Sequence, residues 1–148
     1  MNKENQLYAA YGSNMNLEQM SYRCPYATVI GNAELPGYQL LFRGSQGGAV
    51  ATVEPKENSN VPILLWEITP RDEEELDRYE GWPRFYRKET VVVSYKGKLV
   101  EVMAYIMNDG YLLNLPGKRY YNTIAEGYRS AGFDKKVLED AVMASDQG

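Results

Sequence analysis

The sequence contains no histidine and a single cysteine, Cys24. Without histidine, Ser-His-Asp and Cys-His catalysis are excluded, as is any metal site that needs imidazole. One cysteine forms neither a disulfide within the chain nor a thiolate zinc cage. Cys24 is expected to be a small packing residue, because no base can be named beside it. Acid–base chemistry near pH 7 must therefore come from carboxylates, tyrosines, lysines or the chain termini.

The chain also lacks long apolar runs and an excess of basic residues. No stretch approaches the roughly 20 apolar residues that a membrane helix needs, and the N-terminal MNKENQLYAAYGSN has no apolar signal segment. The 16 Lys and Arg residues are outnumbered by 20 Asp and Glu residues, which gives a net charge of −4. Phosphate binding needs a basic face, so nucleic acid is not expected as a partner. We expect a cytoplasmic protein with no nucleic-acid or membrane partner.

The length and composition fit one globular domain. The chain has 148 residues, of which 44% are hydrophobic and 24% charged, as in ordinary soluble domains. No internal repeat, low-complexity tract or long linker divides it. We therefore predict a single domain over residues 1–148, with residues 1–5 loosely held.

The pattern of apolar residues and turn formers predicts strands with interspersed helices. Strands are expected over residues 6–11, 27–34, 38–42, 49–54, 61–68, 85–95 and 99–107, with turns at 35–37, 55–60 and 96–98. Helices are expected over residues 17–22, 70–79, 120–129 and 135–144. Adjacent strands that pair antiparallel, with helices between them, indicate the α+β class. The predicted architecture is a curved mixed β-sheet that closes toward a small barrel, with flanking α-helices.

The first motif that could carry chemistry is the turn Gly12-Ser13-Asn14, between a predicted strand and a helix. Such a turn can point consecutive backbone N–H groups at one place, where they bind an anion or a developing oxyanion. Gly12 would let the backbone approach a ligand closely. From spacing alone, an ordinary turn in which Ser13 or Asn14 caps the helix is the more common outcome.

The second motif centres on Glu80, at the end of a predicted helix that is rich in acids. A carboxylate at this position faces the negative end of the helix dipole, which would raise its pKa and make it a better base. Tyr79 and Trp82 could shield it from water. The plain alternative is a solvated surface glutamate, and the pattern alone favours that alternative.

Two further patterns are weaker. Tyr121 falls on the first turn of a predicted helix and could offer its hydroxyl group to a ligand, although tyrosines pack in cores more often. The glycine-rich segment 44–48 lacks both the Gly-Lys-Ser/Thr ending of a P-loop and the Gly-x-Gly-x-x-Gly pattern of a dinucleotide fold. Nucleotide binding is therefore rejected.

In their order along the chain, these segments resemble the γ-glutamylcyclotransferase (AIG2-like) family. The segments that carry the resemblance are 8–14 (YAAYGSN), 42–47 (FRGSQG), 48–52 (GAVAT), Trp66, 76–81 (LDRYEG), 105–107 (YIM), Pro116 and Tyr121. They span most of the chain, from about Leu7 to Ile124. The helix predicted from Lys135 onward lies outside the match.

The resemblance implies an enzyme that cyclises the γ-glutamyl part of a small molecule into 5-oxoproline and releases the attached amine. It implies that Glu80 is the catalytic proton acceptor. The residues it implies for substrate binding are Tyr8, Ala9, Ala10, Tyr11, Gly12, Ser13, Asn14 and Tyr121. No metal or cofactor is required, the partner is a γ-glutamyl substrate, and a homodimer is a candidate assembly.

Two alternatives remain at this point. A non-catalytic ligand-binding or interaction domain on the same fold would keep the pocket but leave Glu80 exposed, or paired with Arg78 or Arg84. A related enzyme could instead act on γ-glutamyl-amines, with the same chemistry and a different leaving group. The sequence does not identify the amine that leaves.

Overall fold

Five strands close into a barrel in the computed structural model, which describes residues 5–147. The strands are β1 (Gln6–Ala10), β2 (Thr28–Arg43), β3 (Val50–Ile68), β4 (Tyr86–Tyr95) and β5 (Lys98–Met107). Their order around the barrel is β1-β3-β2-β4-β5. Neighbours pair antiparallel except for β1 and β5, which run parallel and close the barrel. The predicted α+β class and the mixed, closing sheet are confirmed.

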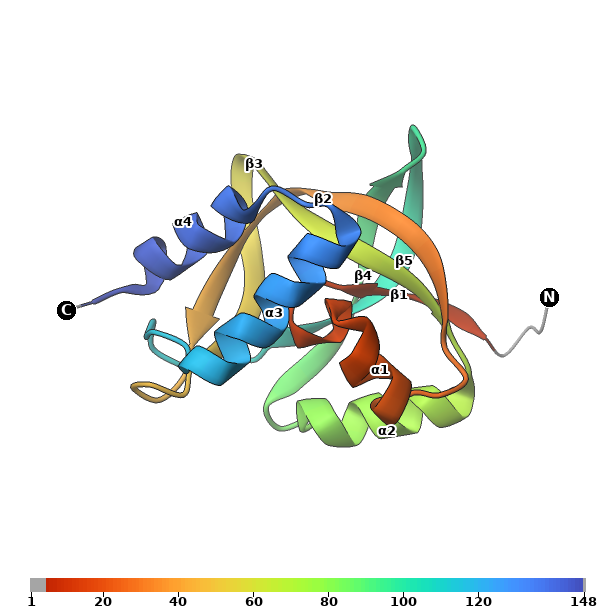
Figure 1. The fold of residues 1–148 in the computed structure, drawn as a ribbon, viewed down its shortest axis with the longest axis horizontal. Coiled ribbons are helices and arrows are strands. Elements are labelled where there is room, and N and C mark those ends of the chain that lie inside the picture. The colour runs from red at the N-terminus through yellow and green to blue at the C-terminus, as the bar shows by residue number, and fades with distance from the viewer. Residues whose placement is uncertain (1–4, 148) are drawn as a thin grey trace.

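The helices cover the outside of this barrel (Figure 1). They are the 3-10 helix η1 (Ser13–Met15), α1 (Leu17–Arg23), α2 (Pro70–Glu80), α3 (Lys118–Ala131) and α4 (Lys135–Ser145). In Figure 1, α1 and α2 lie next to each other below the barrel, while α3 crosses its front and α4 lies along β2. The four predicted helices are confirmed, with ends that differ from the prediction by one or two residues. In the described part of the chain, every helix is too short or too polar to cross a membrane.

The caps of α1 and α2 explain where these helices begin. The Asn16 side chain accepts a hydrogen bond from the backbone N–H of Gln19, which caps α1. At the start of α2, Thr69 and Asp72 form a capping box, and Pro70 occupies the first turn, where its missing N–H costs nothing. Gly81 ends α2 in the left-handed conformation at φ 68°. This glycine stops the helix directly after Glu80.

The predicted turns at residues 35–37 and 55–60 do not separate strands. Instead, β2 and β3 each continue through these segments and pair along almost their whole length. Pro36 pairs with Asn60 and Tyr38 pairs with Pro55, so one residue of β2 lies opposite the four residues 56–59 of β3. Such a bulge tolerates proline within a strand and lets Gly37 and Asn58 adopt positive φ. The prediction of two turns is therefore wrong, and these turn-forming residues mark a bulge between two long strands.

A close contact between α3 and η1 fixes the turn that follows β1. A Cβ atom on Gly127 would lie 2.9 Å from Cβ of Met15, and Met15 is fully buried. Only glycine allows α3 to approach so closely. The segment after β1 is therefore held between the barrel and α3.

The predicted loose segment over residues 1–5 lies mostly outside the residues that the structure describes. Residues 1–4 lie outside them, so the expectation of a loose segment over residues 1–5 concerns Asn5 alone. Its side-chain amide donates a hydrogen bond of 3.0 Å to Oε2 of Glu67.

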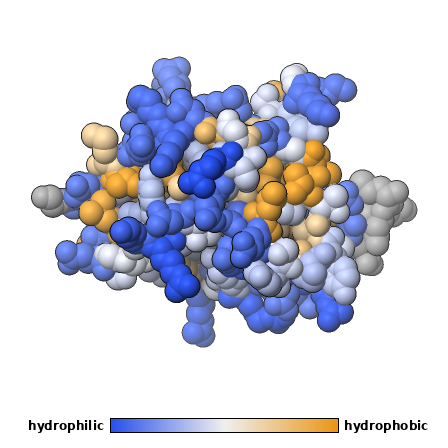
Figure 2. All heavy atoms as spheres, in the orientation of Figure 1, coloured by the Kyte–Doolittle hydropathy of each residue, from blue (hydrophilic) through white to orange (hydrophobic). Residues whose placement is uncertain are grey.

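Hydrophilic side chains cover most of the face shown in Figure 2, and apolar residues form smaller groups among them.

Candidate active site

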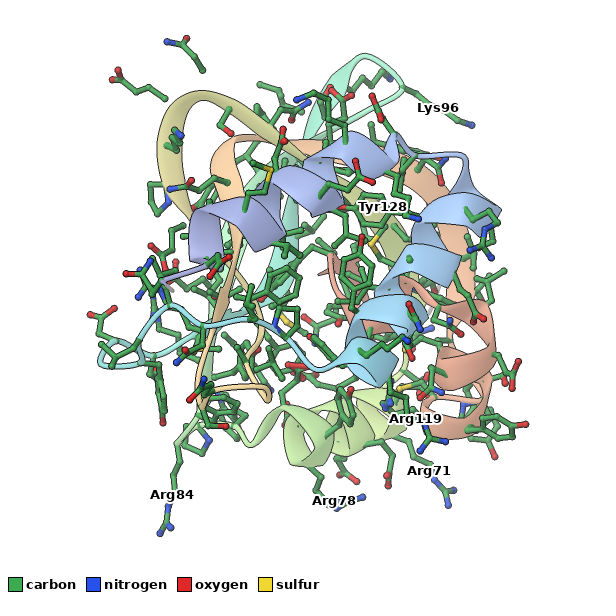
Figure 3. The ribbon with its side chains drawn as sticks, turned by 60° about the vertical axis from the view of Figure 1, so that its left-hand side comes forward. Arg71, Arg78, Arg84, Lys96, Arg119 and Tyr128 are labelled. Carbon is green, nitrogen blue, oxygen red and sulfur yellow. The ribbon has the colours of Figure 1, made fainter. Side chains whose placement is uncertain are left out.

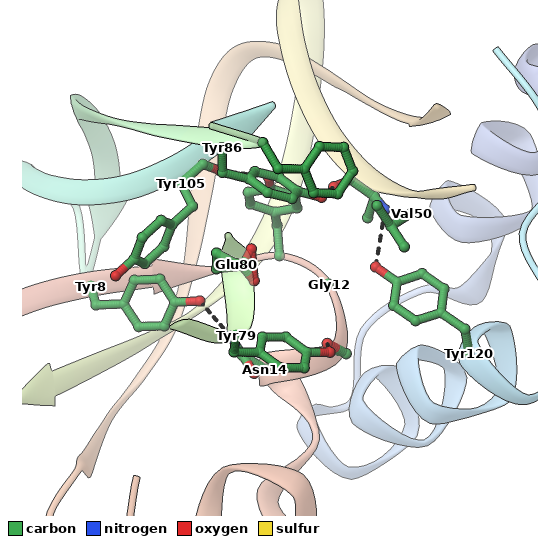
Figure 4. Close-up of a pocket in the computed structure, with 13 residues that line it drawn as sticks. Tyr8, Gly12, Asn14, Val50, Tyr79, Glu80, Tyr86, Tyr105 and Tyr120 are labelled. Atoms are coloured by element: carbon green, nitrogen blue, oxygen red, sulfur yellow. Dashed lines mark hydrogen bonds between the residues drawn. The ribbon is translucent and has the colours of Figure 1, made fainter. Parts of the chain in front are cut away.

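A cavity of about 260 Å³ opens where α2, the turn after β1 and the start of α3 meet the barrel. Figure 4 shows it from close by, with Glu80 near its centre and tyrosine rings around it. The lining residues are Tyr8, Tyr11, Gly12, Ser13, Asn14, Val50, Ala51, Tyr79, Glu80, Phe85, Tyr86, Tyr105 and Tyr120. They come from β1 and the turn after it, β3, the end of α2, the β4–β5 hairpin and α3. Glu80 is the one charged residue among them.

The carboxylate of Glu80 is held in this cavity by the end of α2. Glu80 is the last residue of the helix, and Gly81 turns the chain away directly after it. Protein surrounds the carboxylate on most sides, and this burial raises its pKa to about 7, against an opposing contribution from the Arg23 guanidinium. A carboxylate with such a pKa can accept and return a proton near neutrality.

The arrangement expected for a solvated or salt-bridged Glu80 is not observed. Glu80 lies in the same cavity as Gly12 and Ser13. Arg78 pairs with Glu75 on the outer face of α2. Figure 3 shows the side chains of Arg78 and Arg84 pointing away from the body of the protein. Neither arginine therefore neutralises Glu80.

The turn after β1 brings backbone donors to the opposite wall of the cavity. Ser13 and Asn14 are the first residues of η1, and the first N–H groups of a helix have no partner within it. The N–H of Met15, by contrast, already donates to the Gly12 carbonyl at 3.0 Å. Among the described residues no acceptor is found for the N–H groups of Ser13 and Asn14, so they are available for a ligand.

A chain of hydrogen bonds fixes the orientation of the Asn14 side chain. The Arg23 guanidinium donates to Oδ1 of Asn14, so the Asn14 amide nitrogen is the atom that faces Tyr8. That nitrogen donates to the Tyr8 hydroxyl oxygen at 2.9 Å (Figure 4). The Tyr8 oxygen is therefore an acceptor in this contact, and among residues 5–147 its own hydrogen has no acceptor. It remains available for a ligand.

Tyr120, on the first turn of α3, has the same property. Its hydroxyl oxygen accepts a 3.0 Å hydrogen bond from the backbone N–H of Ala51, and no described residue accepts its hydrogen. Burial raises the pKa values of Tyr8 and Tyr120 well above their ordinary range. Both side chains are therefore neutral donors at physiological pH.

The remaining tyrosines of the cavity are occupied in structural contacts. Tyr11 donates to the Tyr105 carbonyl at 2.6 Å, and Tyr86 donates to the Ala51 carbonyl at 2.5 Å. The Tyr105 hydroxyl donates to Asp77 at 2.6 Å, one turn before Glu80 on α2. These bonds hold the walls of the cavity and the end of α2 in fixed positions.

The sequence-predicted residues divide into two groups. Glu80 and the binding candidates Tyr8, Tyr11, Gly12, Ser13 and Asn14 lie together at the cavity. Ala9, Ala10 and Tyr121 are not among its lining residues. Ala9 and Ala10 are buried within β1, and Tyr121 packs partly buried against the core on another side of α3.

Tyr120 occupies the place that the sequence analysis expected for Tyr121. Consecutive residues of a helix point about 100° apart, so only one of two adjacent tyrosines can face the cavity. Which one does so depends on how α3 packs against η1. Trp82 is also absent from the lining, and the Lys88 ammonium lies 4.2 Å from the centre of its ring.

Sequence reasoning did not single out Tyr86, Tyr105 and Tyr120 as site residues. Tyr86 and Tyr105 lie near the same, open end of the β4–β5 hairpin, where Tyr86 pairs with Met107 and Tyr105 pairs with Lys88. Period-2 alternation in these strands could have placed them on the inner face, but not at this end of the barrel. The hairpin register brings these two tyrosines together, and their approach to Glu80 and Tyr120 depends on barrel closure.

The described residues offer no metal-binding group. No three Asp, Glu, Cys or His side chains gather among residues 5–147. Cys24 is buried, as expected for a packing residue, and burial raises the pKa of its thiol to about 12. At neutral pH this thiol is protonated and a poor nucleophile.

Comparison with known proteins shows where this architecture belongs. Residues 8–128 match the sequence model of the family described as gamma-glutamyl cyclotransferase, AIG2-like. The chain is 29% identical over 146 residues to the gamma-glutamylcyclotransferase of Homo sapiens. The alignment covers 93% of this chain and 77% of the human protein.

Two solved structures extend the likeness to three dimensions. A gamma-glutamyl cyclotransferase superposes with a TM-score of 0.83 at 28% identity and covers 93% of this chain and 86% of that one. YkqA from Bacillus subtilis has a TM-score of 0.82 at 20% identity, with 99% of this chain and 57% of that one covered, and shares the fold. The chain belongs to the gamma-glutamyl cyclotransferase, AIG2-like family.

Proposed function

We propose that this protein converts a γ-glutamyl compound into 5-oxoproline and releases the attached amine. The observation that carries the proposal is that the Glu80 carboxylate, with a pKa of about 7, shares one cavity with the Gly12-Ser13-Asn14 turn. The relatives named gamma-glutamylcyclotransferase support the same reaction. A cavity of about 260 Å³ suits a group as small as γ-glutamyl, since pockets for drug-sized ligands begin at roughly 300 Å³.

Positioning supplies much of the rate in this reaction. The α-amine of the substrate attacks its own γ-carbonyl carbon, so nucleophile and electrophile are parts of one molecule. Well-oriented intramolecular reactions reach effective molarities of about 10⁵ M or more. The walls of the cavity, held by the bonds of Tyr11, Tyr86 and Tyr105, would keep the chain of the substrate folded for ring closure.

The remaining obstacle is the charge of the amine, which is an ammonium at pH 7. A free glutamate has a pKa of about 4.3 and an α-amine about 8, so moving the proton between them in water costs roughly 5 kcal/mol. With the pKa of Glu80 at about 7, that cost falls to about 1–2 kcal/mol. Burial thus makes an ordinary carboxylate an adequate base.

The proposed steps begin when the Glu80 carboxylate accepts a proton from the substrate ammonium. The freed nitrogen then forms a bond to the γ-carbonyl carbon and pushes its electron pair onto the oxygen. The tetrahedral intermediate collapses, the bond to the leaving nitrogen breaks, and Glu80 returns a proton to that nitrogen. The attacking nitrogen gives up its second proton as the ring forms, through Glu80 again, and the released amine takes up that proton. In total the attacking nitrogen loses two protons and the leaving nitrogen gains two, so the amine departs as an ammonium.

Neutral donors on the opposite wall would stabilise the charge that develops. The N–H groups of Ser13 and Asn14 and the hydroxyl group of Tyr8 or Tyr120 have hydrogens available in the cavity. These groups suit the γ-oxyanion and the α-carboxylate of the substrate. Losing one such donor typically lowers kcat about 10²-fold or more.

The test is release of 5-oxoproline by the purified protein from γ-glutamyl dipeptides, γ-glutamyl-amines and glutathione. We expect release from at least one class, and the panel ranks the leaving groups. No release from any of these compounds would contradict the proposal. Binding of the same compounds without turnover would instead support the non-catalytic binding domain.

A further inference from the structure

A second cavity, of about 620 Å³, adjoins the one that contains Glu80. The two share Ser13, Val50, Tyr79 and Tyr120 in their linings. These four residues form the border between them, and a ligand too long for the inner cavity would extend across it. The outer cavity lies between the glycine-rich segment 47–49, the start of α3 and Gln19 of α1.

The charge of the outer cavity is opposite to that of the inner one. Among its lining residues, all in the described part of the chain, Lys118 and Arg119 are the only charged ones. Figure 3 shows Arg119 near the first turn of α3, toward the side where α1 and α2 lie. The protein as a whole carries a net charge of −4, whereas the lining of this cavity carries a net positive charge.

Neither cation has a carboxylate partner in the described part of the chain. The side chains of Lys118 and Arg119 make no hydrogen bond or salt bridge with any of residues 5–147. Lys88 and Arg43, by contrast, are paired with carboxylates: Lys88 with Glu73 and Asp77, and Arg43 with Glu54. These exposed cations line the outer cavity, next to the tyrosine-lined one, and can therefore serve an anionic ligand.

We propose that the outer cavity receives the leaving part of the substrate, and that Lys118 and Arg119 select leaving groups that carry a carboxylate. This inference rests on the proposed function. With the glutamyl end beside Glu80, the scissile bond lies close to the border, and the leaving nitrogen points into the outer cavity. An amino acid carries its carboxylate two bonds from that nitrogen, within reach of long side chains at the start of α3. An amine without a carboxylate leaves both cations unused.

A pair of substrates that differ only in charge tests this selection. γ-Glutamyl-alanine carries the carboxylate, and γ-glutamyl-alaninamide replaces it with a neutral amide of the same shape. We expect wild-type kcat/KM to favour the acid. In the double variant Lys118→Gln, Arg119→Gln, kcat/KM for the acid should fall about tenfold, mainly through KM, while the value for the amide stays within twofold.

Lys135→Gln is the matched control, because Lys135 also begins a helix but lines neither cavity. It should leave the ratio of the two substrates unchanged. Arg119→Glu should reverse the wild-type preference. Release from both substrates with the same ratio in wild type and double variant would overturn the selection and leave the proposed function standing. No release from either substrate would overturn the proposed function and this inference together.

Discussion

The hydroxyl group of Tyr79 lies 2.8 Å from the Oγ atom of Ser13. This contact joins the last turn of α2, which carries Glu80, to the turn after β1, which carries the backbone donors. The Arg23 guanidinium packs against the ring of Tyr79 at 3.5 Å from its centre. The proposed base and the proposed oxyanion site are thus tied together by one side chain, although 66 positions separate Tyr79 from Ser13 in the sequence.

Replacing Tyr79 with phenylalanine removes this tie and keeps the ring. We expect kcat/KM for 5-oxoproline release to fall about 3–10-fold, because a single side-chain hydrogen bond is worth roughly 1 kcal/mol. Tyr22→Phe is the matched control, since Tyr22 is 78% exposed on α1. Equal activity of the two variants would show that the contact does not position the site.

The adjacent tyrosines of α3 give a second matched pair. In Tyr120→Phe, the N–H of Ala51 loses its acceptor and the cavity loses a hydroxyl group, so we expect at least a tenfold loss in kcat/KM and about 1–3 kcal/mol in stability. Tyr121→Phe should change neither by much. Steady-state kinetics and thermal unfolding of both variants measure this, and the opposite order would restore Tyr121 as the ligand-binding residue.

Much of the fold follows from local signals in the sequence. The helices begin at recognisable caps, such as Asn16 before α1 and the Thr69–Asp72 box before α2. Gly81 marks the end of α2 equally well. Glu80 and the turn at Gly12 could therefore be placed at the ends of elements, which is where site residues gather in this structure.

The features that the sequence did not reveal depend on long-range packing. Pro36 and Gly37 look like a hairpin turn, but Pro36 pairs with Asn60 of β3 and Gly37 lies opposite residues 56–59 in a bulge. Tyr120 rather than Tyr121 faces the cavity because α3 packs closely against Met15 at Gly127. Neither the register of two long strands nor the rotation of a helix is encoded in a local window.

The positive charge of Arg23 should lower the pH above which the site is active. This charge lowers the pKa of Glu80 against the larger effect of burial. Arg23→Gln should therefore move the acid limb of the kcat/KM profile to a higher pH than in wild type, in addition to any loss of activity. In Arg71→Gln, which removes a cation beside Tyr26 and away from the cavity, the limb should not move. A downward shift or no shift in Arg23→Gln would contradict this role.

The raised pKa of Glu80 also has a consequence for stability. Between pH 4.5 and about pH 7, Glu80 is protonated in the folded state and ionised in the unfolded state. The contribution of Glu80 to the free energy of unfolding is therefore full below pH 4.5 and is lost as the pH rises through 7. Glu80→Gln removes the charged form and should be about 1–3 kcal/mol more stable than wild type at pH 8. At pH 4 the two should be nearly equal. Urea unfolding at both pH values measures the difference, and a destabilised variant at pH 8 would show that the carboxylate is well solvated.

The most direct test of the central claim is the rate of 5-oxoproline release by wild type, Glu80→Gln and Glu74→Gln at pH 7.5 on one substrate. Glu74 is exposed on the same helix and lies outside the cavity. We expect wild-type activity from Glu74→Gln and a loss of at least 10²-fold from Glu80→Gln, as removal of a general base typically costs 10²–10⁴-fold. Release that persists at the wild-type rate in a folded Glu80→Gln protein would contradict the account.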